Sequence, residues 1–271
     1  MNDVLVSICI PVYNGEKTIA TTMESVLSQT YKNIEIIVVD NCSDDRTAEI
    51  VAGFKDQRIR YYRNETNLGM VGNWNKCIDY ITGEYVLFVC ADDLLHKDSV
   101  YKKAKVLSSK EDTSIVFSAS NIINHDGKIL MHRHTFKKNC IISGKQIAKM
   151  AYHRGNIYGE PTNVMIRMKS LDKVGKFASN TYYSTDLEMW LRLSAVGNVG
   201  YINDELMSYR VASVNETSKI QFKRKMDDDK NLMINIHKSK LLKISKMDDI
   251  IHRVNIVFRT IARSVYMMLF C

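Results

Sequence analysis

The sequence predicts an α/β fold in which helices cover both faces of a mostly parallel β-sheet. Two observations support this prediction. Short β-rich runs alternate with helical patterns along residues 4–119, which is typical of strands joined by right-handed helical crossovers. Several of the β-rich runs are almost unbroken in Val and Ile, which indicates strands that are buried on both sides.

The expected elements follow one another regularly up to residue 119. Their patterns predict strands at 4–12, 33–40, 58–63, 84–90 and 114–119, and helices at 16–29, 44–54, 70–81 and 97–109. Beyond residue 120 the alternation fades. The later patterns predict a hairpin turn at 124–128, a helix from about 143 to 154, a strand within 159–167, an amphipathic helix at 184–197 and two extended pieces within 201–211.

The composition is that of an ordinary globular protein, but its charge is unevenly placed. The chain has 271 residues and a formal net charge of +8. Residues 221–271 hold 11 Lys and Arg against 5 Asp, a net charge of +6. No apolar run approaches the ~20 residues of a membrane-spanning helix, and the N-terminus lacks the basic start of a signal peptide. We therefore expect a cytoplasmic protein, and nothing predicts a nucleic-acid partner.

Polar side chains gather where three of the predicted strands end. The first strand runs into residues 11–14, the second ends at Asp40, and the fourth is followed by Asp92 and Asp93. Because ligands of such sheets bind beyond the carboxyl ends of the strands, we expect the site at this edge. No P-loop motif is present, and no G-x-G-x-x-G follows the first strand, which disfavours P-loop and dinucleotide-binding functions.

The charged groups of this expected crevice are acidic. Neighbouring carboxylates repel each other unless a positive charge lies beside them. A divalent cation with oxygen ligands, Mg²⁺ or Mn²⁺, would allow such a crevice to hold a diphosphate. The sequence therefore predicts a metal-assisted nucleotide site.

Four spaced motifs resemble the family 2 glycosyltransferases of the GT-A fold, which has a Rossmann-like nucleotide-binding sheet. They are SICIPVYNGEKTIATTMESVLSQTYKNIEIIVVDNCSDDRT, NETNLGMVGNWNKCI, GEYVLFVCADDLL and STDLEMWLRL, in the family's order between about residues 5 and 211. The resemblance implies a GT-A catalytic domain over 1–215, with a nucleotide-sugar half at 1–120 and an acceptor half at 121–215. Residues 216–271 then form a basic helical tail.

The resemblance also implies an activity. A sugar would pass, with inversion, from a nucleotide diphosphate sugar to an acceptor hydroxyl, with Mn²⁺ or Mg²⁺ as cofactor. A UDP-sugar is the favoured donor, and the enzyme would be a hexosyl- or N-acetylhexosaminyltransferase. The family's commonest setting, surface-polysaccharide assembly, implies a glycan or lipid-linked glycan as acceptor.

The resemblance assigns roles to residues by motif. Asp186 would be the general base, and Asp93 would bind the metal. Glu160 and Trp190 are candidate acceptor contacts. The nucleotide-binding residues would be Pro11, Tyr13, Glu16, Asp40, Asn67, Gly69, Lys76 and Asp92.

The sequence departs from the family pattern at two positions. Trp74 stands where relatives often have the Arg of an Arg-Asn pair, and Lys76 is a candidate replacement for its charge. Ala212 stands where many relatives have a His that approaches the metal, which leaves the third metal ligand open.

Each site residue also has a purely structural interpretation. Asp92 and Asp93 could be a charged pair at the start of the following helix, and Asp40 could be a turn former. Asp186 could serve only to cap its helix, where Thr185 and Glu188 have capping-box spacing. The same helix dipole is expected to keep Asp186 ionised at neutral pH. Trp190 could be a core residue.

Two other functions remain open at this stage. A nucleotidyltransferase of similar fold would need an electropositive loop after the first strand, where the sequence offers only Lys17. A catalytically silent nucleotide-sugar-binding module would use the same residues without turnover.

The C-terminal segment is predicted to be an amphipathic helix. Its apolar face would hold Ile250, Val254, Val257, Phe258, Ile261, Val265, Met268 and Leu269, opposite His252, Arg259 and Arg263. Two interpretations remain open. The helix packs on the catalytic domain, or it lies peripherally on the anionic inner face of the cell membrane, where a lipid-linked acceptor would be found.

Overall fold

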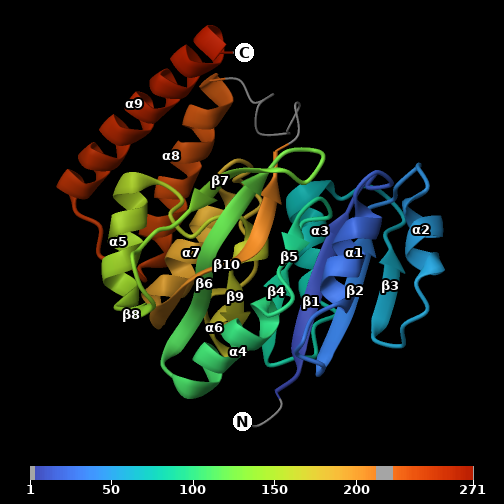
Figure 1. Cartoon of the computed structure of the whole chain (residues 1–271). Helices are drawn as coiled ribbons and strands as arrows, with labels where there is room; N and C mark the ends of the chain where they lie inside the picture. The colour runs from blue at the N-terminus through green and yellow to red at the C-terminus, as the bar shows by residue number, and fades with distance from the viewer. Residues whose placement is uncertain (1–3, 212–221, 271) are drawn as a thin grey trace.

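The computed structural model describes residues 4–211 and 222–270, with side chains in the second range for 223–258 (Figure 1). Ten strands of this part form one sheet in the order β3-β2-β1-β4-β9-β6-β10-β5, with β7 beside β6 and β8 beside β10. The strands are β1 (Val6–Val12), β2 (Ile34–Asp40), β3 (Ile59–Arg63), β4 (Tyr85–Phe88), β5 (Leu94–Leu95), β6 (Thr113–Ile123), β7 (Ile129–Arg133), β8 (Cys140–Ile142), β9 (Met165–Arg167) and β10 (Asn198–Arg210).

Helices connect most of these strands. They are α1 (Ile19–Leu27), α2 (Thr47–Gly53), α3 (Gly69–Ile78), α4 (Ser99–Ser109), α5 (Gly144–Arg154), the 3₁₀-helix η1 (Pro161–Asn163), α6 (Met168–Val174), α7 (Thr185–Ala195), α8 (Phe222–Ser239) and α9 (Lys246–Phe270). The helices predicted along residues 16–109 are present, each within a few residues of its expected ends.

The N-terminal half of the sheet is parallel. β1 pairs in parallel with β2 and with β4, and β2 pairs in parallel with β3. The registers place Val12 opposite Asp40, and Asp40 opposite Arg63. The carboxyl ends of these strands therefore lie at one edge of the sheet, as the sequence predicts.

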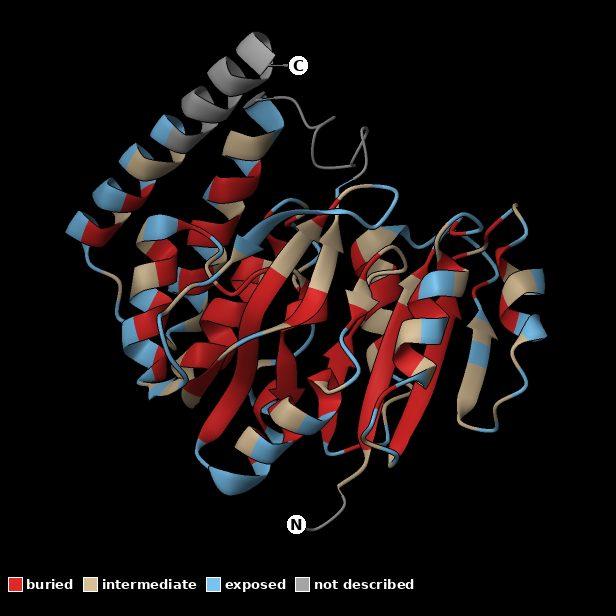
Figure 2. Ribbon diagram, viewed as in Figure 1, coloured by how far each residue is buried: buried red, intermediate tan, exposed pale blue. Residues whose placement is uncertain are grey.

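Helices cover both faces of the sheet, which confirms the predicted fold class (Figure 2). Alternate residues of each strand enter two different cores: Ile8 packs with α1, α2 and α4, whereas Cys9 packs with α3, α5 and α7. Ile36 and Ile37 divide between the two cores in the same way. This two-sided burial explains the unbroken Val and Ile runs of the sequence.

The C-terminal half is mixed, and here the sequence prediction is less accurate. β9 lies antiparallel between β4 and β6, while the long strands β6 and β10 are parallel. The sequence predicts two extended pieces within 201–211, but the residues up to Arg210 belong to the single strand β10, which has register shifts around Glu205. The polar residues Asn203 and Asp204 look like the end of a strand in the sequence. In the structure the strand bulges at this point and continues.

The C-terminal helices share the core of the preceding half. Leu232, Met233 and Ile236 of α8 and Leu242 after it are buried in the same cluster as residues of α5 and α7. The predicted domain boundary at 215, like Ala212, falls at 212–221, which lie outside the described residues. The boundary stays a prediction, but α8 packs on the sheet-bearing part of the molecule.

A buried ion pair ties α7 to the end of α6. Arg192 contacts Glu188 through two hydrogen bonds of 2.8 and 2.6 Å, and both side chains are almost inaccessible to solvent. The guanidinium also donates to the backbone carbonyls of Val174 and Lys176. Glu188 is therefore engaged with Arg192, so the capping box predicted for α7 does not form, and α7 has no side-chain N-cap hydrogen bond.

This ion pair generates a stability prediction. Arg192→Met should lower the free energy of unfolding by ~3–5 kcal/mol, because it leaves the Glu188 carboxylate buried without its partner. The double variant Glu188→Leu/Arg192→Met should be more stable than Arg192→Met, because no buried charge remains. Urea unfolding measures both values. A double variant with a lower free energy of unfolding than Arg192→Met would contradict this account.

Candidate active site

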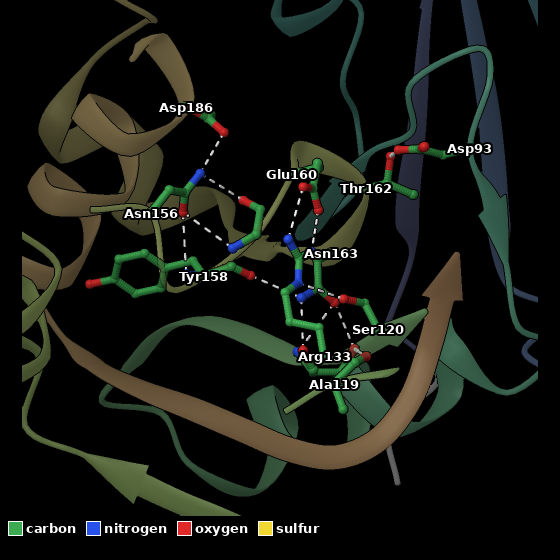
Figure 3. Close-up of polar contacts among 12 residues, drawn as sticks. Asp93, Ala119, Ser120, Arg133, Asn156, Tyr158, Glu160, Thr162, Asn163 and Asp186 are labelled. Atoms are coloured by element: carbon green, nitrogen blue, oxygen red, sulfur yellow. Dashed lines mark hydrogen bonds and ion pairs between the residues drawn. The ribbon is translucent and has the colours of Figure 1, made fainter. Parts of the chain in front are cut away.

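Four carboxylates converge at the carboxyl edge of the sheet, and three of them are drawn in Figure 3. Asp92 and Asp93 follow β4, Glu160 precedes η1, and Asp186 lies in the first turn of α7. The negative charge of Glu160 contributes to raising the pKa of both Asp93 and Asp186. Residues that the sequence places on three separate segments thus share one electrostatic environment.

Asp93 lies at the base of this group and has 0% of its surface exposed. Its Oδ2 accepts a hydrogen bond of 2.6 Å from the Thr162 hydroxyl, and its Oδ1 accepts one of 3.1 Å from the backbone N–H of Arg210. Burial, followed by the charge of Asp92, raises the pKa of Asp93 well above its usual value. This geometry does not favour the predicted role of Asp93 as the metal ligand, because solvent and ligand cannot reach the carboxylate.

Asp92 is the carboxylate of the pair that remains partly exposed. Burial raises its pKa, and the positive charge of Arg210 opposes that shift. The Arg210 guanidinium donates to the backbone carbonyls of Asp92 at 3.0 Å, of Asn124 at 3.2 Å and of His125 at 2.7 Å. The positive charge beside the two aspartates is therefore, in this structure, an arginine.

The carboxylates of the site are the candidate ligands for the predicted Mn²⁺ or Mg²⁺. In the described residues, no group of three or more His, Cys, Asp or Glu side chains could hold a metal ion. Asp92 offers one accessible carboxylate, and Mg²⁺ is often held by one or two carboxylates together with substrate phosphates. The residues therefore fit a cation that arrives with a diphosphate, and not a site complete in the protein alone.

Glu160 forms an ion pair with Arg133, in which the Arg133 Nη1 donates to Glu160 Oε1 at 3.0 Å (Figure 3). Arg133 also donates to the Ser120 hydroxyl at 3.0 Å, which fixes the guanidinium to β6. Gly159 permits this approach, because its φ is +91° and an added Cβ would lie 2.8 Å from the Arg133 Nη2. Glu160 thus lies in the predicted region, but its charge is already paired.

Asp186 is half-buried and is oriented by Asn156 (Figure 3). Asn156 Nδ2 donates to Asp186 Oδ2 at 2.6 Å, and the Leu187 N–H donates to Oδ1 at 2.7 Å. Asn156 is itself held by the backbone of Tyr158 and Gly159. Burial raises the pKa of Asp186 to about 7, despite the N–H of Leu187. The expectation that the helix dipole keeps Asp186 ionised at neutral pH is therefore met only in part, because desolvation opposes the dipole.

On the predicted nucleotide-binding side of the site, the Asp40 carboxylate is buried and already hydrogen-bonded within the protein. Asp40 is fully buried at the end of β2, where its Oδ1 accepts from the N–H of Ser43 at 2.8 Å. Its Oδ2 accepts from the Tyr61 hydroxyl at 2.6 Å and from Arg63 at 3.3 Å. Both carboxylate oxygens of Asp40 are therefore engaged within the protein, and its predicted nucleotide-binding role stays a prediction.

The remaining nucleotide candidates of this side lie near the predicted edge. Pro11 is partly exposed, and Tyr13 and Glu16 are exposed in the loop after β1. Asn67 Oδ1 accepts from Asn41 Nδ2 and from the N–H of Gly69, both at 2.8 Å. Gly69 has a φ of +72° at the start of α3. The nucleotide-binding roles of these residues stay predictions.

Two further predicted contact residues, Lys76 and Trp190, lie on α3 and α7. Lys76 lies seven residues into α3, roughly 10 Å along the helix from Gly69, and its Nζ lies 3.9 Å from Asp79 Oδ2 and over the Tyr80 ring. Trp190 is 0% exposed and packs edge-on against Phe177. Trp190 is therefore a core residue that no acceptor can reach, whereas the nucleotide-binding role of Lys76 stays a prediction.

Four residues that organise the site were missed in the sequence, namely Arg133, Asn156, Thr162 and Arg210. Asn156 and Gly159 have the spacing of a side-chain-stabilised turn, which is a local signal. Arg210 belongs to a Tyr-Arg pair that lies two residues before Ala212, the position of the family's His. Arg133 and Thr162 have no local signal, because their partners lie 27 and 69 residues away.

Comparisons with known proteins agree with this geometry. The model of glycosyl transferase family 2 matches residues 7–175. An uncharacterized protein of Mycobacterium tuberculosis is 32% identical over 232 residues, which cover 82% of this chain and 72% of that protein. A UDP-Glc:α-D-GlcNAc-diphosphoundecaprenol β-1,3-glucosyltransferase of Escherichia coli is 36% identical over 126 residues, or 46% of this chain and 49% of that enzyme. The chain spans about a third of the length of three uncharacterized glycosyltransferases of Rickettsia.

A solved structure shows the same fold. TarS 1–349 of S. aureus, in complex with UDP-GlcNAc, superposes with a TM-score of 0.74 at 18% identity, and the match covers 93% of this chain and 71% of that one. The family match covers more than half of this chain. The chain therefore belongs to the family 2 glycosyltransferases and has the GT-A fold.

Proposed function

We propose that this protein is an inverting glycosyltransferase in which Asp186 is the general base. The observation that supports this role most is the environment of Asp186, which Asn156 orients and whose pKa burial raises to about 7. A base works best when its pKa lies near the operating pH. Asp186 accepts hydrogen bonds from the Asn156 amide and the Leu187 N–H, whereas Glu160 is already paired with Arg133.

The proposed step is a single displacement. Asp186 accepts the proton of the acceptor hydroxyl as that oxygen forms a bond to the anomeric carbon of the donor sugar. The bond from this carbon to the diphosphate oxygen breaks, and its electron pair leaves with the nucleoside diphosphate. Because attack and departure occur on opposite sides of the carbon, the configuration inverts. Asn156 holds Asp186 in place for this step.

A divalent cation, Mn²⁺ or Mg²⁺, would be held by Asp92 together with the donor diphosphate. When bound, such an ion stabilises the negative charge that develops on the leaving diphosphate. Asp93 would support this arrangement from below, because its contacts with Thr162 and Arg210 fix the turn that carries Asp92.

The donor and acceptor classes are also proposals. The TarS structure contains UDP-GlcNAc, and the Escherichia coli relative is named for transfer from UDP-Glc to a diphosphoundecaprenol-linked sugar. These names support a UDP-hexose or UDP-N-acetylhexosamine as donor and a lipid-linked glycan as acceptor for this chain. The setting would be surface-polysaccharide assembly.

α9 supports an anionic membrane surface as a further partner. Its apolar side chains Met247, Ile250, Ile251, Val254, Val257 and Phe258 are 37–72% exposed. The opposite, polar face contacts the rest of the protein: Asp248 accepts from Lys149 at 2.9 Å, and His252 is buried against Asp229 at 2.7 Å. Exposed Lys243, Lys246 and Arg253 accompany the apolar stripe. Ile261, Val265, Met268, Leu269, Arg259 and Arg263 lie outside the described side chains.

An apolar stripe flanked by basic residues matches the lipid interface of an anionic membrane. No helix of the described part of the chain is long and apolar enough to cross a bilayer. In Figure 1 the C-terminal end of α9 lies at the same end of the molecule as the tips of the parallel strands. A surface bound along α9 would therefore lie beside the edge of the sheet that carries the site.

The proposed base generates a pH prediction. In wild-type protein, kcat/KM for UDP-sugar cleavage should rise as the pH increases through about 7, since Asp186 must lose its proton to act. Asp186→Asn should reduce turnover by roughly 10²–10⁴ and abolish this limb of the profile, while donor affinity changes by less than about threefold. UDP release and calorimetry measure the two quantities. If wild-type protein binds the donor but never cleaves it, a silent binding module is the correct interpretation.

The two aspartates generate a paired prediction. Asp92→Asn should keep the fold but remove the Mn²⁺ dependence of UDP-sugar binding, measured by calorimetry against UDP-, GDP- and dTDP-sugars. Asp93→Asn should lower the free energy of unfolding by ~1–3 kcal/mol, because its amide cannot accept both hydrogen bonds of the buried carboxylate equally well. If UDP-sugar binding stays Mn²⁺-dependent in Asp92→Asn but becomes Mn²⁺-independent in a stably folded Asp93→Asn, then Asp93 is the metal ligand.

The α9 surface generates a lipid-binding prediction. The full chain should bind phosphatidylglycerol vesicles, and salt should weaken binding because charges are screened over ~8 Å at 0.15 M. Val254→Asp/Phe258→Asp should weaken binding at least tenfold, since each apolar side chain contributes ~1.5–3 kcal/mol when buried. Leu130→Asp, at an exposed position of β7, is the matched control. If the full chain does not bind vesicles but forms a concentration-dependent dimer that the same double variant abolishes, the apolar stripe of α9 is a contact with a second copy of the chain.

A further inference from the structure

One face of α8 contacts the loop that leads into the base-bearing helix α7. Arg224, Asp228, Asn231 and Asn235 recur at helical spacing and face residues 180–184. α8 packs against α7 in the same region (Figure 1). The stripe lies outside the four motifs that resemble the family and beyond residues 7–175, which the family model matches.

Asp228 makes the central contacts of this stripe. Its Oδ2 accepts from the backbone N–H of Ser184 at 2.8 Å and also from the Ser184 hydroxyl, and its Oδ1 accepts from the backbone N–H of Tyr182. The side chain is buried, so these donors have no ready replacement from solvent. A buried carboxylate with three donors is a rigid attachment point.

The other residues of the stripe hold the start of the same loop. Asn231 donates to the carbonyl of Asn180 at 2.8 Å, and the amides of Asn235 and Asn180 exchange hydrogen bonds of 2.8 and 3.1 Å. The Arg224 guanidinium lies 4.8 Å from the centre of the Tyr182 ring. The loop is therefore held by α8 at both of its ends.

Fixing Ser184 fixes the first turn of α7. Ser184 is the residue immediately before this helix, and its carbonyl accepts the N–H of Glu188 at 2.8 Å, which begins the helical pattern. Asp186 lies two residues after Ser184. Its carboxylate accepts hydrogen bonds from the Asn156 amide and from the N–H of Leu187, and neither bond fixes the position of the backbone that carries Asp186.

We propose that Asp228 is a positioning residue for the general base, so that α8 is part of the catalytic apparatus and not a separable tail. This proposal rests on the proposed role of Asp186. In this proposal, Asp228 contacts neither the donor sugar nucleotide nor the acceptor. It holds the Ser184 backbone, and the helix that starts there carries Asp186 to the acceptor hydroxyl. A displacement of about 1 Å at such a group costs up to ~10² in rate.

The test compares Asp228→Asn with Asp227→Asn, the same charge change at the neighbouring exposed position of α8. The probe is UDP-GlcNAc with Mn²⁺ on the full chain. Asp228→Asn should lower kcat for UDP release by about 10–100-fold with donor affinity unchanged within about threefold. Asp227→Asn should match wild type. Ser184→Ala, which removes one donor and keeps the N–H contacts, should lower kcat by about fivefold.

Amide exchange provides a readout that does not depend on the donor. In Asp228→Asn the amides of 182–188 should exchange faster, while those of α5 keep wild-type protection. Normal kcat, or faster exchange throughout the molecule with a proportional loss of folded protein, would overturn the positioning role. Asp186→Asn serves as the reference. If this variant keeps normal turnover, Asp186 is not the general base. If it loses turnover while Asp228→Asn is fully active, only the role of Asp228 is refuted.

Discussion

The buried carboxylate of Asp93 is the constraint on which the site depends. It joins the turn after β4 to Thr162 of η1 and to the end of β10 at Arg210, positions 69 and 117 residues away in the sequence. A buried carboxylate is costly unless its hydrogen bonds are made, so these three segments cannot separate without exposing that cost. Asp92 and Glu160 are neighbours of these fixed points, and their positions follow.

The N-terminal half of the fold could be predicted from the sequence because its information is local. Period-2 and period-3.6 patterns identify strands and helices, and parallel topology then brings residues such as Asp40 and Asp92 to one edge. The C-terminal half could be predicted only in part. β9 is placed by pairing with β4 and β6, and the bulge near Glu205 is set by its neighbours, neither of which leaves a local pattern.

At the site, the sequence could predict the carboxylates but not their accessibility. Asp92 and Asp93 are adjacent and chemically identical, and only distant partners decide that Asp93 is the buried one. The same distinction applies to Asp186. A local argument from the helix dipole predicts an ionised group, whereas burial, which depends on the whole fold, raises its pKa to about 7. The acceptor contact predicted for Trp190 is wrong because a motif gives spacing along the chain and not depth in the structure.

α9 packs in the reverse of the usual orientation, with its polar face inward, and specific contacts explain why. His252 lies between Asp229 and Tyr152, and the His252 and Tyr152 rings stack at 4.3 Å. Rotating the helix to bury its apolar face would leave these polar groups buried without partners. Asp229 is adjacent to Asp228 on α8, so consecutive residues hold the outward-facing helix and the loop before Asp186. One rigid helix thereby supports both the surface proposed to meet the membrane and the base proposed to act there.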